Sequence, residues 1–407
     1  MNGIPTYFGE IALQERYIDE NILHECLELQ KICRQPVLLG EIFVQKGFMD
    51  AEHVMRILKL QENFKNKLQN EYLAHILLKK KLITSKQLQE LRRKYAQEVL
   101  TGNATTFANL AIEAKILNHT LVENLMKDEE YVYIENLKKQ GKTSIAGYEL
   151  VGKITQLRKA EIYKAIQVNL DRLVSIKALL KEFETTEQIQ EFFKEAKITS
   201  HFNHPNLVRV YDTGLKNDMY YYAMEFVEGE NLSDKLQREG RLQVGESLRI
   251  IRQVCQALEH IHNDEYIHGQ VNPRNIVLRE DKVVKVLDLR YCCKMNQEYP
   301  FFKITQMPQY MAPEQFLTNV SFDQRTDIYC LGVTFYRMLT GKPAVTGKTI
   351  EEIKVNVVEQ EPTPIQDIDF TIPEPLAKIV HRMMRKDPAK RYPDIRRILF
   401  ALKKILV

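Results

Sequence analysis

Residues 266–290, which read YIHGQVNPRNIVLREDKVVKVLDLR, decide the fold of the second half of this chain. Two short apolar runs, at 276–278 and 283–287, predict two strands with a polar turn between them. Asn275 stands just before the first strand and Asp288 just after the second. Both side chains carry oxygen atoms of the kind that ligate divalent cations. The stretch therefore predicts two metal-type ligands at the edges of two strands.

The same stretch resembles the catalytic loop and the metal loop of the eukaryotic-type, or bacterial Hanks-type, serine/threonine protein kinases, H-R-D-x-x-x-x-N followed by D-F-G. Here the first motif reads H-G-Q at 268–270 with Asn275 at the family's spacing, and the second reads D-L-R at 288–290. The resemblance implies that Asn275 and Asp288 are the metal ligands. Gln270 holds the position of the catalytic aspartate, and an amide has no site that accepts a proton near pH 7.

The resemblance covers residues 148–407, because further kinase motifs follow in the order that the family has. It implies an α+β, bilobal fold, with a β-rich small lobe at 148–227 and a helical large lobe at 228–407. The elements predicted from apolar periodicity are strands that begin at Tyr148 or span 162–165, 173–179 and 207–211, and a helix over 244–263.

Four positions match nucleotide-binding residues of the family. Lys177 ends a V-S-I-K run that is similar to the V-A-I-K strand, and Glu195 falls where a helix supplies the partner of this lysine. A structural ion pair that ties helix to strand is the alternative interpretation of these two residues. Glu225 and Val227 lie in a run, 220–229, that resembles the hinge strand whose backbone binds adenine. The resemblance implies weak ATP binding that depends on Mg²⁺ or Mn²⁺.

Other family residues are replaced. Thr155, Leu157 and Ala160 stand where the family has the glycines of its phosphate loop, and side chains there obstruct the approach of backbone N–H groups to phosphates. Asn272 stands in place of the lysine that neutralises the transferring phosphoryl group, and Met307 in place of a threonine that bridges the catalytic residues. The resemblance therefore identifies three neighbouring catalytic positions, counting Gln270, that have changed together.

The scaffold motifs are kept. Glu314 ends an A-P-E box, and the resemblance implies that Arg391 is its ion-pair partner. Asp327 begins a D-I-Y-C-L-G run that is similar to the family's helical anchor of the catalytic loop. These matches predict a large lobe that folds normally even where the catalytic residues differ.

The combination predicts a catalytically impaired kinase relative, a pseudokinase, that acts on other proteins as a signalling regulator or scaffold. An active serine/threonine kinase is the alternative, because loss of the general base alone lowers a rate by only about 10²–10⁴. The further replacements at Asn272 and in the phosphate loop remove charge and positioning as well, so the impaired relative is favoured.

The first 140 residues contain four segments that align without gaps and begin at Phe8, Leu39, Leu73 and Phe107. In each, apolar residues recur at helical spacing, a break follows, and a second apolar stretch begins. Residues 1–140 are therefore predicted to form an all-helical domain of four repeats. A unit this small cannot bury its apolar face alone, so the four are expected to pack on each other.

Helix ends within the repeats are marked by capping residues. Gly47 ends a helix in the second repeat and Asp50 caps the next one, while Thr84 and Gln87 have the spacing of a capping box. The polar run that follows the repeats predicts a linker at 141–147.

The first two repeats resemble the N-terminal domain of type II secretion and pilus ATPases, some of which bind cyclic di-GMP. In those nucleotide-binding members an arginine precedes the L-G pair, but here Tyr7 and Leu38 hold these positions. A helical protein-interaction module is therefore favoured, and cyclic dinucleotide sensing is the alternative.

Composition excludes several other classes. The net charge of +4 is too small and too evenly spread to indicate a nucleic-acid partner. The six cysteines show neither a C-x-x-C pair nor zinc spacing, which predicts reduced thiols. No apolar run is long enough to span a membrane and no signal peptide is recognised, so a cytoplasmic protein is expected.

Overall fold

The computed structural model describes residues 7–32, 37–100, 105–125, 144–216, 219–296, 307–317 and 320–405. The chain divides into two compact units. The first comprises Met1–Lys181 with Gly214–Tyr221, and the second comprises Glu182–Thr213 with Tyr222–Val407. These units are defined by contacts within the chain, and the domain boundaries predicted from the sequence stay a prediction.

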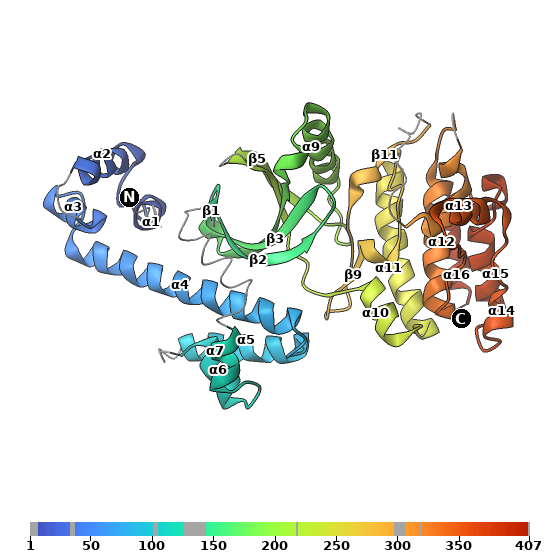
Figure 1. Cartoon of the computed structure of the whole chain (residues 1–407), viewed down its shortest axis with the longest axis horizontal. Coiled ribbons are helices and arrows are strands. Elements are labelled where there is room, and N and C mark those ends of the chain that lie inside the picture. Colours follow the sequence, from blue (N-terminus) through green and yellow to red (C-terminus); the bar gives the residue numbers. More distant parts are fainter. Residues whose placement is uncertain are drawn as a thin grey trace. The chain divides into compact units, whose positions relative to one another are not determined.

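The N-terminal part of the first unit is helical, as predicted. Its helices are α1 (Tyr7–Gln14), α2 (Glu20–Ile32), α3 (Leu39–Gln45), α4 (Ala51–Lys79), α5 (Ser85–Leu100), α6 (Phe107–Glu113) and α7 (His119–Leu125). A short helix precedes a longer one in α1 to α4, whereas α6 and α7 have the same length. The second helix of the second segment and the first helix of the third are one continuous helix, α4 (Figure 1).

The predicted helix ends are confirmed. The Asp50 carboxylate accepts a hydrogen bond of 2.8 Å from the His53 N–H at the start of α4. Thr84 and Gln87 exchange bonds before α5, because the Thr84 N–H donates to Gln87 and the Gln87 N–H donates to the Thr84 hydroxyl. Gly47 follows α3 with φ at 75°, a left-handed conformation that glycine adopts without strain.

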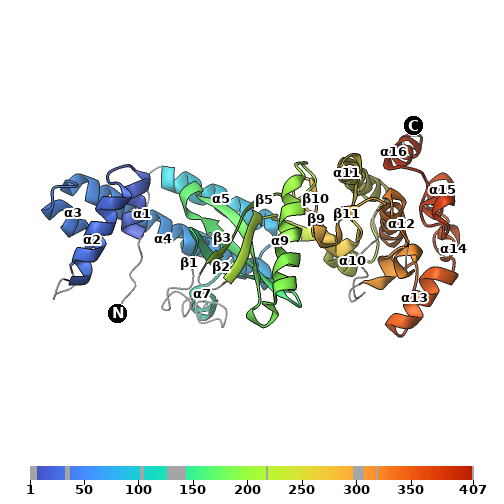
Figure 2. The ribbon, with the colours of Figure 1, turned by 90° about the horizontal axis from the view of Figure 1, so that it is seen from above.

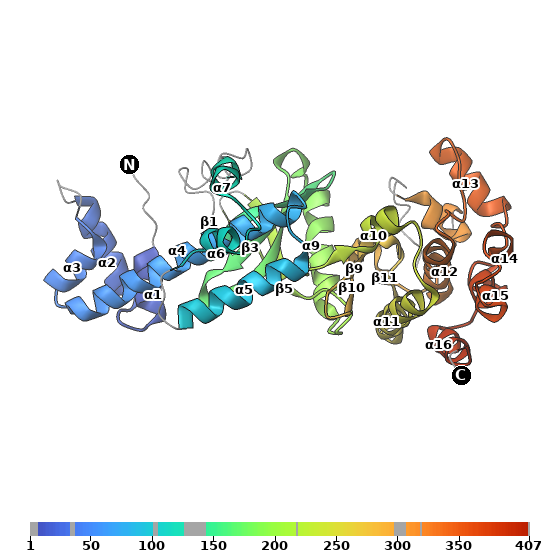
Figure 3. The same cartoon turned by 90° about the horizontal axis from the view of Figure 1, so that it is seen from below.

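The helices do not share one core among the residues that the structure describes. One cluster joins α1 to α3 with the first half of α4 (Figure 2), and its buried residues include Phe8, Phe43 and Ile57. A second cluster joins the later half of α4 with α5 to α7 (Figure 3). The expectation that all four repeats pack on each other is therefore wrong: the segments pair two by two, and the second pair packs on a β-sheet.

The sheet has six strands in the order β1-β2-β3-β4-β6-β5. Its strands are β1 (Ser144–Ile145), β2 (Tyr148–Gln156), β3 (Ala160–Gln167), β4 (Arg172–Leu179), β5 (Val210–Lys216) and β6 (Met219–Glu225). The strand predicted at 207–211 begins later, at Val210, while Leu207 forms an isolated bridge to Val286. Buried Val151 and Ile166 of this sheet complete the second helical cluster.

The linker predicted at 141–147 differs from the structure at its end. Residues 141–143 lie outside the described part, and Ser144–Ile145 form β1, which pairs with the start of β2. Ala146 and Gly147 between these strands both have positive φ, 49° and 84°, as a two-residue type I′ hairpin requires. The segment is therefore part of the sheet rather than an open connection.

The second unit is mainly helical around one large apolar core. Its elements are α9 (Thr186–His201), β7 (Glu230–Asn231), α10 (Leu232–Glu239), α11 (Val244–Asn263), β8 (Tyr266–Ile267), β9 (Ile276–Leu278), β10 (Val284–Val286), β11 (Cys293–Lys294), α12 (Gln324–Thr340), α13 (Ile350–Glu359), α14 (Ile365–Ile368), α15 (Glu374–Met383) and α16 (Ile395–Lys403). The helix predicted at 244–263 is confirmed as α11.

Helix α12 lies in the centre of this core, and each of its residues from Thr326 to Tyr336 is buried. Gly332 lets α15 approach closely, because a Cβ there would lie 2.8 Å from the Cβ of Met383. The anchor helix predicted from the sequence is thus enclosed along most of its length, and Asp327 on it binds the backbone of residues 268 and 269.

The sequence predicts no membrane-spanning run and no oxidised cysteine, and the structure bears on both only within its described residues. No helix in the described ranges is long and apolar enough to cross a membrane. Five of the cysteines are free thiols, whereas Cys33 lies outside the described residues.

Candidate nucleotide and catalytic site

The two predicted metal ligands lie at the same end of a hairpin. Strands β9 and β10 are antiparallel, with Ile276 opposite Val286. Asn275 directly precedes β9, and its carbonyl accepts a 2.8 Å hydrogen bond from the N–H of Leu287, the residue before Asp288. The sequence-predicted arrangement of strands is confirmed, while the roles of Asn275 and Asp288 as ligands stay a prediction.

The catalytic-loop segment is held by α12. The Asp327 carboxylate accepts hydrogen bonds of 2.8 Å from the N–H groups of His268 and Gly269, and it also contacts His262 Nε2 at 2.8 Å. Burial raises the pKa of Asp327, but the bonds from His262 and His268 outweigh burial, so the pKa lies below its usual range. An ionised, buried carboxylate therefore fixes the backbone on which Gln270 stands.

Gln270 is 8% exposed. The backbone carbonyl oxygen of Gln270 accepts hydrogen bonds from the side-chain amides of Asn272, at 3.1 Å, and Asn275, at 3.0 Å. The Asn272 amide also accepts from the Arg274 N–H. Asn272 thus holds the loop together, and it carries no positive charge that could neutralise a phosphoryl group.

Arg290, at the position of the family's metal-loop glycine, lies between two carboxylates. Its Nη2 is 3.5 Å from Asp288 Oδ2, and its Nε is 3.9 Å from Glu195 Oε2 on α9. The neighbouring Asp288 carboxylate and, to a smaller extent, Glu195 raise the pKa of Arg290 above its usual range, although burial opposes this. Tyr222 donates a 2.9 Å hydrogen bond to Glu195 Oε1.

These contacts test whether the site fits the divalent cation that the family implies. The Asn275 amide nitrogen donates to the backbone carbonyl of Gln270. The amide oxygen, Oδ1, is therefore the Asn275 atom that would face a metal. Asp288, however, accepts the Arg290 N–H with Oδ1 and faces the guanidinium with Oδ2. A bound cation would lie beside a permanent positive charge, so the residues present do not fit a divalent metal as they stand.

The positions of the family's glycine loop lie in the first unit, at the end of the β2–β3 hairpin. Thr155 is paired with Ile162 on β3, and the Leu157 N–H donates to the Ala160 carbonyl at 2.8 Å. That N–H group is therefore used within the hairpin. The hairpin forms without glycine at residues 155, 157 and 160, which is consistent with the predicted loss of the phosphate-binding backbone.

Lys177 is buried on β4, opposite Ile162 on β3. It belongs to the first unit and Glu195 to the second, so the predicted ion pair between them stays a prediction.

The hinge residues follow β6. Glu225 is paired with Lys285 of β10 at 2.7 Å, and its N–H donates to the Arg209 carbonyl at 2.8 Å. Val227 is half-buried beyond the end of the strand. The Glu225 side chain is thus occupied within the second unit, and adenine binding by this stretch stays a prediction.

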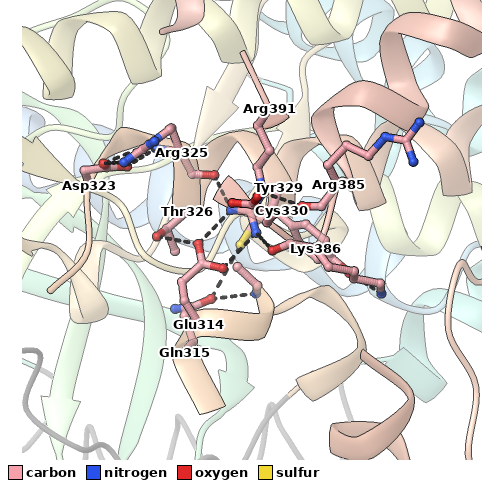
Figure 4. Close-up of polar contacts among 12 residues, drawn as sticks. Glu314, Gln315, Asp323, Arg325, Thr326, Tyr329, Cys330, Arg385, Lys386 and Arg391 are labelled. Atoms are coloured by element: carbon pink, nitrogen blue, oxygen red, sulfur yellow. Dashed lines mark hydrogen bonds and ion pairs between the residues drawn. The ribbon is translucent and has the colours of Figure 1, made fainter. Parts of the chain in front are cut away.

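The scaffold pair is confirmed. Arg391 donates to both oxygens of Glu314, at 2.7 and 2.8 Å, and the Thr326 hydroxyl donates to the same carboxylate (Figure 4). Met307, the third replaced catalytic position, precedes this region with φ at 58°, a left-handed conformation that is rare for a side chain of this size.

Three contacting residues were not found from the sequence. Tyr222 lies within the hinge run, His262 near the end of α11, and Gln315 next to the A-P-E box, where its amide donates to the Gly269 carbonyl at 2.8 Å. Strand alternation places Tyr222 on a defined face, but it does not indicate which residue lies opposite.

Comparison with known proteins agrees with this geometry. A family model described as protein kinase domain matches residues 148–399. A probable serine/threonine-protein kinase of Clostridium perfringens is 34% identical over 261 residues, which are 63% of this chain and 38% of the relative. PrkC of Bacillus subtilis is 29% identical over 255 residues, 62% of this chain and 39% of the relative. Serine/threonine-protein kinase pkn3 of Myxococcus xanthus is 31% identical over 265 residues, 62% of this chain and 48% of the relative. The chain thus spans less than half the length of these relatives, and its match to the family model over more than half of its own residues shows that it belongs to the protein kinase family.

Proposed function

We propose that this protein is a kinase-fold signalling regulator or scaffold for other proteins, with impaired phosphotransfer. The observation that carries the proposal is the identity of Gln270: the catalytic-loop position that the family uses as a general base holds a buried amide. An amide cannot take the proton of a substrate hydroxyl near pH 7.

The size of the loss depends on the neighbours of this position. A kinase turns over at about 1–100 s⁻¹, and loss of the base costs about 10²–10⁴ of that rate. Some turnover would remain if this were the sole defect. Asn272, however, supplies an amide in place of a cation, and its amide already binds the Gln270 carbonyl. The charge that stabilises the transferring phosphoryl group is therefore also missing.

A transfer assay with radiolabelled ATP tests the proposal on the full chain. We expect no incorporation into the protein itself or into generic substrates with Mg²⁺ or Mn²⁺. Gln270→Asp alone should not restore transfer, whereas adding Asn272→Lys supplies the missing cation and is the variant in which weak transfer is expected first. Incorporation by the natural protein that disappears in both Lys177→Ala and Asp288→Ala would contradict the proposal.

The second candidate is an active serine/threonine protein kinase. It is favoured by the intact Glu314–Arg391 anchor and by the Asp327 carboxylate that holds the catalytic-loop backbone. The curated relatives carry the name serine/threonine-protein kinase. The same transfer assay separates the two candidates.

A further inference from the structure

The Arg290 side chain lies between Glu195 and Asp288. The Arg290 side chain is 32% exposed, that of Asp288 26%, and that of Glu195 7%. The guanidinium therefore faces two carboxylates, its Cζ lies 6.0 Å from the centroid of the Tyr291 ring, and the side chain as a whole is partly exposed to solvent. The arginine brings a permanent charge to the place where the family has a residue without a side chain.

The carboxylate partners are held where they are. Tyr222 donates to Glu195 Oε1 while the other oxygen, Oε2, faces Arg290. Burial, followed by the nearby Glu195 charge, raises the pKa of Tyr222 well above its usual value, so the hydroxyl stays protonated and keeps donating. Asp288 is fixed by the Arg290 N–H as well as by its guanidinium.

A divalent cation and the guanidinium would compete for this site. Both would approach Asp288 Oδ2, the oxygen that faces the guanidinium at 3.5 Å, and two positive groups within a few ångströms repel each other. A phosphate chain has the opposite requirement, because guanidinium groups bind phosphate oxygens directly and in a fixed geometry. The exposed part of Arg290 is suited to that role.

We propose that Arg290 takes the electrostatic place of the divalent cation, so that this site binds the phosphates of a nucleoside triphosphate without a metal requirement. This proposal rests on the kinase-fold nucleotide site of the proposed function, but it does not depend on the rate of phosphotransfer. It replaces the expectation from the sequence that ATP binding depends on Mg²⁺ or Mn²⁺.

Thermal unfolding of the full chain with millimolar ATP tests the proposal. For the natural protein we expect equal melting shifts with ATP in EDTA and with ATP plus Mg²⁺ or Mn²⁺, of about 5–10 °C if ATP reaches 100 times its dissociation constant. Arg290→Ala should lose the shift in EDTA and regain it with metal. Arg290→Lys keeps the charge and should retain most of the metal-free shift.

The matched control is Arg396→Ala, which also removes an ion-paired arginine, here the partner of Glu259 at 2.8 Å on the surface of α16. It should behave as the natural protein does. The proposal is overturned if the natural protein responds to ATP solely when metal is present, if Arg290→Ala is unchanged, or if no condition gives a shift. Radiolabel transfer measured on the same samples reports separately on the proposed function, because active transfer would contradict impaired catalysis without restoring a metal requirement for binding.

Discussion

Two ion-pair networks, each centred on a glutamate, differ in how completely they exclude solvent. In the second unit, Arg391 donates to both oxygens of Glu314, at 2.7 and 2.8 Å. In the first unit, Lys164 of β3 and Arg92 of α5 both donate to one oxygen of Glu71 on α4, each at 2.8 Å. The first is a bidentate pair inside one lobe, while the second is a triad that joins helices to a sheet.

The surroundings of the two networks differ as well. Every guanidinium nitrogen of Arg391 has an acceptor, since Arg391 also donates to the backbone carbonyls of Arg325, Arg385 and Lys386. Glu71 is partly exposed, at 13%, whereas Lys164 is 2% exposed. The motif shared with the family is therefore the more enclosed of the two, and the contact between the helices and the sheet depends on a more exposed arrangement.

The largest effect is expected from breaking the enclosed pair. Arg391→Met leaves Glu314 buried and without its bidentate partner, and removing one member of such a pair costs about 3–5 kcal/mol in the free energy of unfolding. Urea denaturation followed by circular dichroism measures this. Arg396→Ala, which removes a surface pair, should cost less than about 1 kcal/mol. Equal losses in the two variants would mean that the burial of the Glu314–Arg391 pair adds nothing to the free energy of unfolding.

A smaller loss is expected from Glu71→Gln. Lys164 then stays buried without its carboxylate, and because Glu71 and Arg92 reach solvent, the cost should fall to about 2–3 kcal/mol. Replacing both partners, as in Glu71→Leu with Lys164→Met, should recover most of it, since apolar pairs of similar volume replace buried ions well. A double variant as unstable as the single one would argue that the triad is not what joins α4 to the sheet.

A third substitution tests the contact between α4 and the sheet through steric fit. Gly152 on β2 faces His75 of α4, and a Cβ at residue 152 would lie 2.6 Å from His75 Cδ2. The histidine side chain has to move, so Gly152→Ala should cost about 1–2 kcal/mol, in the range of overpacking. His75→Ala in the same chain should remove most of that cost. Additive losses from the two substitutions, measured by the same denaturation, would show that the two residues do not press on each other.

The smallest effect is a pH dependence of the triad. Burial raises the pKa of Glu71, but Lys164 and Arg92 outweigh burial, so the pKa is lowered in the folded protein. A lowered folded pKa contributes stability above the unfolded value, about 4.3, and this is lost as the pH falls through the folded pKa. The difference in stability between the natural protein and Glu71→Gln should therefore shrink below about pH 4. A difference that is constant between pH 3 and 7 would contradict this.

Much of the fold could be predicted because its signals are local or ordered along the chain. Helix α11 was predicted with its exact bounds from apolar periodicity, and the caps at Asp50 and Thr84 need contacts no more than three residues apart. The Glu314–Arg391 pair was predicted by resemblance, because the two motifs that contain it keep their order in the kinase family. The missing base at Gln270 followed from the same alignment.

The contacts made by Arg290 could not be predicted to the same extent. The sequence shows an arginine where the family has glycine, but a long side chain has many rotamers, and the identity of its partners depends on where α9 places Glu195. Tyr222 likewise reaches Glu195 across the fold, from a strand 27 residues away in sequence.

The sequence by itself determined the order of the elements, the kinase-type large lobe and the replaced catalytic positions, because periodicity, capping and motif spacing are properties of neighbouring residues. The tertiary structure alone decided that the helices form two cores, that the predicted linker ends in β1, and that Glu71 meets Lys164 from 93 residues away. Leucines at helical spacing must be buried, but their periodicity is the same whether a helix or a sheet covers them. Which surface covers them is decided by shape and charge in three dimensions, since burial of apolar area has no direction of its own and a buried charge needs its partner at one specific place.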